Sequence, residues 1–147
     1  YYGDVMKPKE STLIEIKSET KTDAKKNETV ISSGEILEEK NINGVPVLKI
    51  NSDFSLMNIG KIQTAINSYL SDKKAKNLVV DLTALDFIDS AAIGVLVKST
   101  LLMRQYQGIM ALVPNEKMNT IFRMTNLLSI VKIFNSVDEA VQFIQSK

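Results

Sequence analysis

The chain has 147 residues, of which 44% are hydrophobic and 24% charged, and its formal net charge is +1. This suits a single domain with a real core, and the balanced charge gives no reason to expect direct binding to nucleic acid. The chain contains no cysteine and no histidine, which excludes a disulfide framework, a thiol nucleophile and a Ser-His-Asp triad, so we expect no enzyme, no catalytic residues, no metal site and no cofactor.

The first part of the chain differs in composition from the rest. Residues 1–33 are rich in Ser, Thr, Lys and Glu, which cannot bury enough apolar surface to offset the entropy of ordering. We therefore expect a polar N-terminal arm or linker over residues 1–33, in part disordered. A short strand at residues 12–17 is an option, because apolar and polar residues alternate there. The folded domain is predicted to span residues 34–147.

Two further expectations concern the parent protein and its location. No apolar run approaches the roughly 20 residues that a membrane-spanning helix needs, so we expect no membrane span in this chain and a cytoplasmic location. The chain begins with Tyr1 rather than Met, so we expect it to be a fragment or a processed product.

A β-hairpin is predicted near the start of the folded domain. Residues 36–39 and 45–50 have the pattern of two strands, and Asn43-Gly44 supplies the turn because both residues tolerate positive φ. Pro46 cannot donate a hydrogen bond to a neighbouring strand, so it is expected at a strand start or on a sheet edge.

Helices and strands alternate after the hairpin. Apolar residues recur at helical spacing from Ile59 to Leu70, and Ser55 is the expected N-cap. Apolar runs at residues 78–82 and 109–113 are typical of strands covered on both faces. The other predicted elements are a helix from Ala91 that Gly108 ends at its C′ position, a helix at 116–124, a strand at 130–134, and a last helix opened by a capping box of Ser136 and Glu139. Strands that alternate with helices predict an α/β fold with a mostly parallel sheet and right-handed crossovers.

The stretch FIDSAAIG, residues 87–94, places a serine where a buried strand gives way to a helix. The first backbone N–H groups of a helix lack intrahelical partners and carry partial positive charge, so an oxygen-bearing side chain or a phosphate is favourable there. Ser90 is therefore a candidate helix cap and a candidate phosphorylation site, and the two roles are compatible. Asp89 is a candidate acceptor for loop amides.

The element order and several segments resemble the STAS domain, the fold of bacterial anti-sigma-factor antagonists. The segments are GVPVLKINSDFS (44–55), NLVVDLTALDFIDSAAIGVLV (77–97) and the run from Tyr106 to Val141. The resemblance implies a STAS-like α/β fold with a hairpin start, four to five mostly parallel strands and helices packed mainly on one face. The sequence differs from the commonest family pattern at Ala91-Ala92, where Ser or Thr and then Gly are usual.

The resemblance implies a protein-binding switch. In the regulatory branch of the family the phosphorylated residue follows the motif's Asp, which maps onto Ser90. The unphosphorylated protein would sequester an anti-sigma factor that is also a serine kinase, phosphorylation would release it, and a PP2C-type phosphatase would reverse the modification. We expect this switch to act through surface charge rather than by refolding.

The partner-binding surface is expected beside Ser90, where the loop after the hairpin and the less apolar face of the following helix come together. Its predicted members are Asp53, Phe54, Ser55, Asp89, Ala91, Gly94 and Lys98. Small residues on the helix would let a partner approach closely.

Other functions remain open at this point. The main alternative is a STAS subunit without phosphoregulation in a transporter or stress-signalling complex, which Ala91-Ala92 favours. A regulatory domain of an anion transporter is another. An enzyme acting on small molecules is disfavoured because the sequence has no His, no Cys and no Gly-rich phosphate loop.

Overall fold

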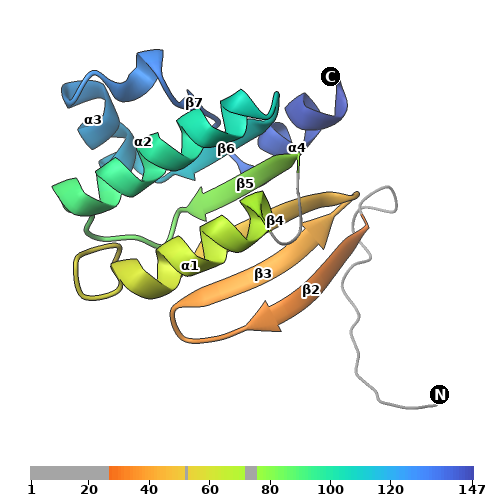
Figure 1. Ribbon diagram of the computed structural model, residues 1–147, viewed down its shortest axis with the longest axis horizontal. Helices are drawn as coiled ribbons and strands as arrows, with labels where there is room; N and C mark the ends of the chain where they lie inside the picture. Colours follow the sequence, from red (N-terminus) through yellow and green to blue (C-terminus); the bar gives the residue numbers. More distant parts are fainter. Residues whose placement is uncertain (1–26, 52, 72–75) are drawn as a thin grey trace.

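A computed structural model describes residues 27–51, 53–71 and 76–147, and in that part of the chain six strands form one sheet (Figure 1). The sheet order is β2-β3-β4-β5-β6-β7. The strands are β2 (Glu28–Ser33), β3 (Leu37–Ile42), β4 (Val45–Ile50), β5 (Asn77–Leu82), β6 (Ile109–Pro114) and β7 (Lys132–Ile133). The helices are α1 (Ile59–Leu70), α2 (Ser90–Gln105), α3 (Glu116–Met124), the 3₁₀ turn η3 (Leu127–Ser129) and α4 (Val137–Gln145).

The sheet is mixed, and its class agrees with the predicted α/β fold. Strands β2, β3 and β4 pair antiparallel, whereas β4, β5, β6 and β7 pair parallel. The described sheet has six strands instead of the expected four to five, because β2 adds an edge strand within the stretch expected to be an arm. The remainder of that stretch, with the optional strand at 12–17, lies outside the described residues. Strand β7 has two residues instead of the five predicted.

The predicted hairpin turn is confirmed. Asn43 and Gly44 have φ values of 53° and 87°, the positive pair that a two-residue turn between right-twisted strands requires. Because the turn is this short, Ile42 pairs directly with Val45, and β3 continues past its predicted end at residue 39.

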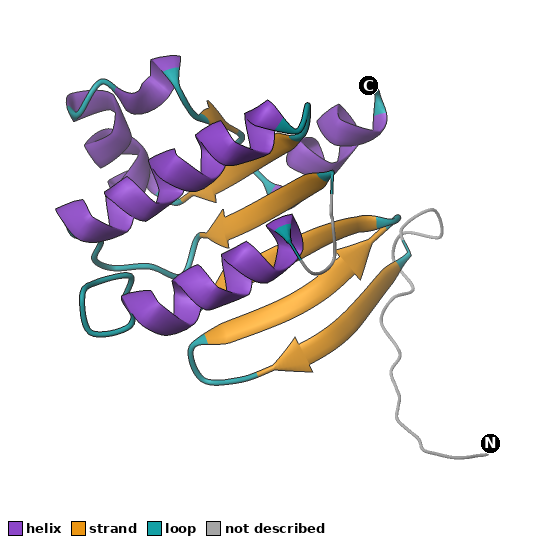
Figure 2. Cartoon of the chain, viewed as in Figure 1, coloured by secondary structure: helices purple, strands orange, loops and turns teal. Residues whose placement is uncertain are grey.

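The sheet buries a hydrophobic layer on each face. Alternate residues of the central strands point to opposite sides, so Leu78 and Val80 join the core under α1, α2 and α3, whereas Val79 joins the core under α4. Figure 2 shows α1 and α2 lying across the same face of the sheet. The predicted placement of the helices mainly on one face is therefore confirmed, and among the described helices α4 is the one that covers the other face.

Helix α2 ends in a Schellman motif whose left-handed residue is not the predicted one. Gln107 has a φ of 63°, and the Gly108 N–H donates to the Met103 carbonyl at 2.8 Å. The expectation that Gly108 occupies the C′ position is therefore wrong by one residue. A glycine is still required at 108, because a Cβ there would lie 1.9 Å from the backbone oxygen of Lys76.

Tyr69 joins the helical layer to the sheet through a partly buried hydrogen bond. Its hydroxyl, on α1, donates to Oε1 of Glu39 on β3 at 2.5 Å, and burial together with this bond raises the pKa of Tyr69. We expect Tyr69→Phe to lower the free energy of unfolding by about 1–3 kcal/mol, because a hydrogen bond to a charged group is lost. Urea denaturation measures this difference. Tyr106→Phe is the matched control, since Tyr106 is exposed, and equal stability of both variants and the wild type would contradict the assignment.

Within the described residues, no helix is both long enough and apolar enough to cross a membrane.

Candidate functional site

Ser90 is the first residue of α2, and its side chain is exposed. The strand before it, β5, ends at Leu82, so a loop over residues 83–89 joins strand and helix in place of the direct transition that the sequence predicted. It is not the N-cap, so the expectation of a Ser90 cap is wrong. The N-cap is Asp89, whose backbone is extended and whose Oδ1 accepts the N–H of Ala92 at 2.9 Å. With Asp89 satisfying this amide, the Ser90 hydroxyl is not needed to cap the helix.

Asp89 also binds the loop that precedes α1. Its Oδ2 accepts the N–H of Leu56 at 2.9 Å, so one carboxylate joins the loop to the start of α2. The backbones of the two segments are also hydrogen-bonded to each other. The Phe54 N–H donates to the Phe87 carbonyl at 3.2 Å, and the Asp89 N–H donates to the Phe54 carbonyl at 3.3 Å. The loop at 53–58 is therefore attached directly beside Ser90.

The same contacts fix the charge of Asp89. The N–H of Ala92, and after it that of Leu56, hold the pKa of Asp89 below its ordinary value because they stabilise the carboxylate. Asp89 is thus negatively charged at neutral pH, directly next to the Ser90 hydroxyl.

We expect Asp89→Asn to lower the stability of the protein at neutral pH, because an amide oxygen is a weaker acceptor for the two backbone N–H groups. The folded-state pKa of Asp89 is lowered, so the stabilisation is fully present above the unfolded-state value of about 3.9 and is lost as the pH falls through the folded-state value. Thermal melts of both proteins from pH 7 down to pH 2 measure this. A difference between the two proteins that stays constant over the whole range would contradict it.

The loop residues predicted to bind a partner differ in accessibility. Asp53 is exposed and Ser55 is half-buried, but Phe54 has 0% of its surface exposed and packs in the core. Phe54 is therefore corrected from a partner contact to a core residue, which its backbone bonds to residues 87 and 89 hold in place. Ser55 is also not the N-cap of α1. Asn58 takes that position, and its side-chain amide donates to the Asp53 carbonyl at 2.8 Å.

The helix residues predicted for the surface lie together. Ala91, Gly94 and Lys98 are exposed on successive turns of α2, on the side of the helix that carries Ser90. A Cβ at Gly94 would meet nothing within 4 Å, so the fold does not require a glycine there. The open space leaves room for a partner to approach the backbone.

The named members of the predicted partner surface did not include an apolar patch that lies beside Ser90. It consists of Leu56, Met57 and Phe87, whose side chains are 72%, 91% and 51% exposed. Leu56 and Met57 lie ahead of α1, because the helix begins at Ile59 and not after Ser55. Large apolar side chains grouped at the surface are typical of a protein-binding site. The signal in the sequence is Met57, an apolar residue that falls outside the helical spacing of Ile59, Ile62 and Ile66.

Among the described residues, no three His, Cys, Asp or Glu side chains are close enough together to bind a metal ion. The candidate site consists of an exposed hydroxyl, an ionised carboxylate and an apolar patch at the start of a helix. This combination can dock a protein partner, and its charge can be changed by modification of the hydroxyl.

Known proteins share this architecture. A provisionally assigned anti-sigma factor antagonist of Thermotoga maritima is 28% identical over 109 residues, which cover 74% of this chain and 96% of that protein. Its crystal structure superposes with a TM-score of 0.69 over 74% of this chain and 94% of the other. Unphosphorylated SpoIIAA, also an anti-sigma factor antagonist, superposes with a TM-score of 0.58 at 12% identity over 82% of this chain and all (100%) of its own, and shows the shared fold alone. The sequence profile of the STAS domain matches residues 37–140, so this chain belongs to the STAS domain family.

Proposed function

We propose that this STAS protein is an anti-sigma-factor antagonist, a binding protein and not an enzyme, whose partner surface is the start of α2 with the loop beside it. The observation that carries the proposal is the exposed Ser90 hydroxyl, next to the ionised Asp89 and the apolar patch. The name given to the Thermotoga relative supports the same function.

Phosphorylation of Ser90 would act through charge. The phosphate would add about −1.5 to −2 charges directly next to the Asp89 carboxylate. Asp89 already occupies the helix cap, so the phosphate would not take over the Ala92 N–H, and the net effect would be like-charge crowding on the partner surface. We expect the fold to stay as it is, and the partner to be repelled from this surface.

The partner would be an anti-sigma factor that also acts as the Ser90 kinase, and a PP2C-type phosphatase would restore the binding form, with the cycle running in the cytoplasm. The residues proposed to contact the partner are Asp53, Ser55, Asp89, Ala91, Gly94 and Lys98 from the sequence, joined by the apolar patch. Leu56 and Met57 are the expected anchors, since they are the most exposed side chains of the apolar patch and their burial by a partner would be favourable.

Affinity capture from cells of the source organism tests the proposal. The bait is the full chain as wild type, as Met57→Ser, or as Met124→Ser, which removes a methionine that is 80% exposed at the end of α3. We expect the wild type and Met124→Ser to retain an anti-sigma factor, and Met57→Ser to retain at least about tenfold less. Equal retention by all three baits would place the interface elsewhere. Retention of a transporter ATPase in place of an anti-sigma factor would identify a constitutive STAS subunit.

A further inference from the structure

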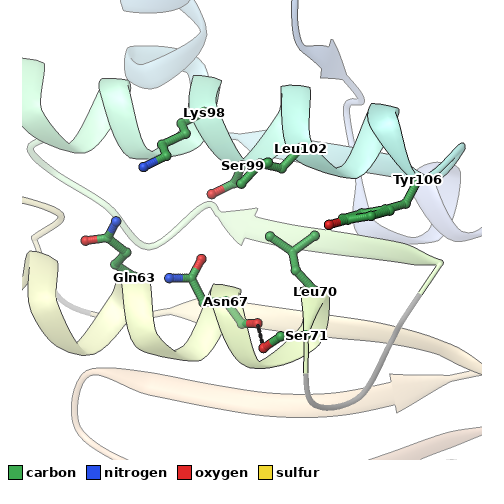
Figure 3. Close-up of a pocket in the computed structure, with 8 residues that line it drawn as sticks. All are labelled: Gln63, Asn67, Leu70, Ser71, Lys98, Ser99, Leu102 and Tyr106. Atoms are coloured by element: carbon green, nitrogen blue, oxygen red, sulfur yellow. Dashed lines mark hydrogen bonds between the residues drawn. The ribbon is translucent and has the colours of Figure 1, made fainter.

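A groove lies between α1 and α2, on the side of α2 that faces the neighbouring helix (Figure 3). Its volume is about 400 Å³, within the range of roughly 300–1,000 Å³ that small-molecule sites occupy. Helix α1 contributes Gln63, Asn67 and Leu70, and α2 contributes Lys98, Ser99 and Leu102.

Ser99 is the unusual member of the lining. Its residue surface is only 4% exposed, yet its hydroxyl has no hydrogen bond to any described residue, and it points into the groove (Figure 3). The neighbouring buried hydroxyl of Thr100 is satisfied by the Leu96 carbonyl at 2.8 Å. Buried polar groups are nearly always hydrogen-bonded to protein or water, so the Ser99 hydroxyl is available to a water molecule or to a ligand in the groove.

Three more polar side chains reach the same end of the groove. Figure 3 shows the Lys98 ammonium and the side-chain amides of Gln63 and Asn67 directed into the space beside the Ser99 hydroxyl. None of these three side chains has a hydrogen bond or ion pair within the described part of the chain. The described lining contains one cation and no carboxylate, so this end of the groove favours an anion that accepts several hydrogen bonds.

Leu70 and Leu102 line the other end of the groove, together with Ser71 and with Tyr106, whose hydroxyl points into the space (Figure 3). We propose that the groove binds a small organic anion, a carboxylate with a short apolar tail, whose head group contacts Lys98 and Ser99 and whose tail lies against the two leucines. The groove shares Lys98 with the partner surface proposed above, but none of its other lining residues belongs to that surface.

Titration of the ¹⁵N-labelled full chain by NMR tests this inference. The probe is hexanoate, with 1-hexanol as the neutral match and acetate as the head group alone. We expect saturable shifts confined to the residues that line the groove, with a dissociation constant of about 1 mM, as suits a ligand of this size. Hexanol and acetate should bind at least about tenfold more weakly, because hexanol lacks the carboxylate and acetate lacks the apolar tail. No saturation by hexanoate, shifts centred elsewhere, or equal binding of hexanol would overturn the proposal.

Two variants separate recognition from folding. Lys98→Met should weaken hexanoate binding at least about tenfold, whereas Lys61→Met, which removes an exposed lysine elsewhere on α1, should leave it unchanged. Ser99→Ala should also weaken binding, while the melting temperature of the free protein does not fall, because its hydroxyl has no partner to lose. Equal binding by Lys98→Met and Lys61→Met, or a lowered melting temperature for Ser99→Ala, would contradict the assigned roles.

Discussion

A chain carrying Ser90→Asp is expected to bind its anti-sigma partner at least about 100-fold more weakly than the wild type. The substitution puts a second carboxylate next to Asp89, whose charge is fixed by the N–H groups of Ala92 and Leu56. A partner that covers this surface would have to desolvate two adjacent like charges without a compensating cation, and an unpaired charge in an interface costs about 2–5 kcal/mol. Calorimetric titration with the captured partner measures the affinity.

Two controls make the Ser90→Asp result specific. Ser90→Ala should bind within about threefold of the wild type, because the hydroxyl is not the helix cap and its loss leaves the charge unchanged. Gln105→Asp adds the same charge to an exposed position on the same helix, about 22 Å further along its axis, and should leave the affinity unchanged. Wild-type affinity of Ser90→Asp, or an equal loss in Gln105→Asp, would contradict the account.

Gly108→Ala is expected to destabilise the protein by about 3 kcal/mol or more. The added Cβ would lie 1.9 Å from the Lys76 oxygen and 2.8 Å from Cγ of Met103, so the backbone itself would have to move. That movement would also strain the bond from the Ile109 N–H to the Lys76 carbonyl at 3.2 Å, next to the pairing of β5 with β6. Urea denaturation followed by circular dichroism gives the free energy of unfolding.

Gly94→Ala is the matched control for Gly108→Ala. Both replace a glycine with alanine, but a Cβ at Gly94 meets nothing within 4 Å and the position lies inside α2. We expect this variant to gain about 0.5–1 kcal/mol from helix propensity. Equal stability of the two variants would show that the close approach to Lys76 does not restrict residue 108.

The features that were predicted correctly from the sequence are determined by residues close together in the chain. The Asn43-Gly44 turn and the Ser136 cap, whose Oγ accepts the Glu139 N–H at 3.1 Å, are each specified by neighbouring residues. Strand β2 was missed because all of its residues are exposed, and an edge strand without a buried face has no hydrophobic alternation to detect.

The errors at the candidate site have long-range causes. Asp89 and Ser90 are both capable N-caps, and the Leu56 N–H, 33 residues away in sequence, is satisfied by Asp89 in the structure. Phe54 and Met57 are both apolar residues of one loop, and the sequence does not show which of them enters the core. In the structure a β-bridge pairs Phe54 with Ile88, so Phe54 is buried and Met57 is exposed. The exposure of Ser90 could be predicted, whereas the apolar patch depends on where α1 begins.

Phosphopeptide mass spectrometry of the protein isolated from its own cells, with and without stress, tests the central claim most directly. The account predicts a phosphate on Ser90 in unstressed cells that is lost when the cells are stressed, so that the binding form accumulates. An unmodified Ser90 under every condition, with the peptide detected at full coverage, would contradict the switch.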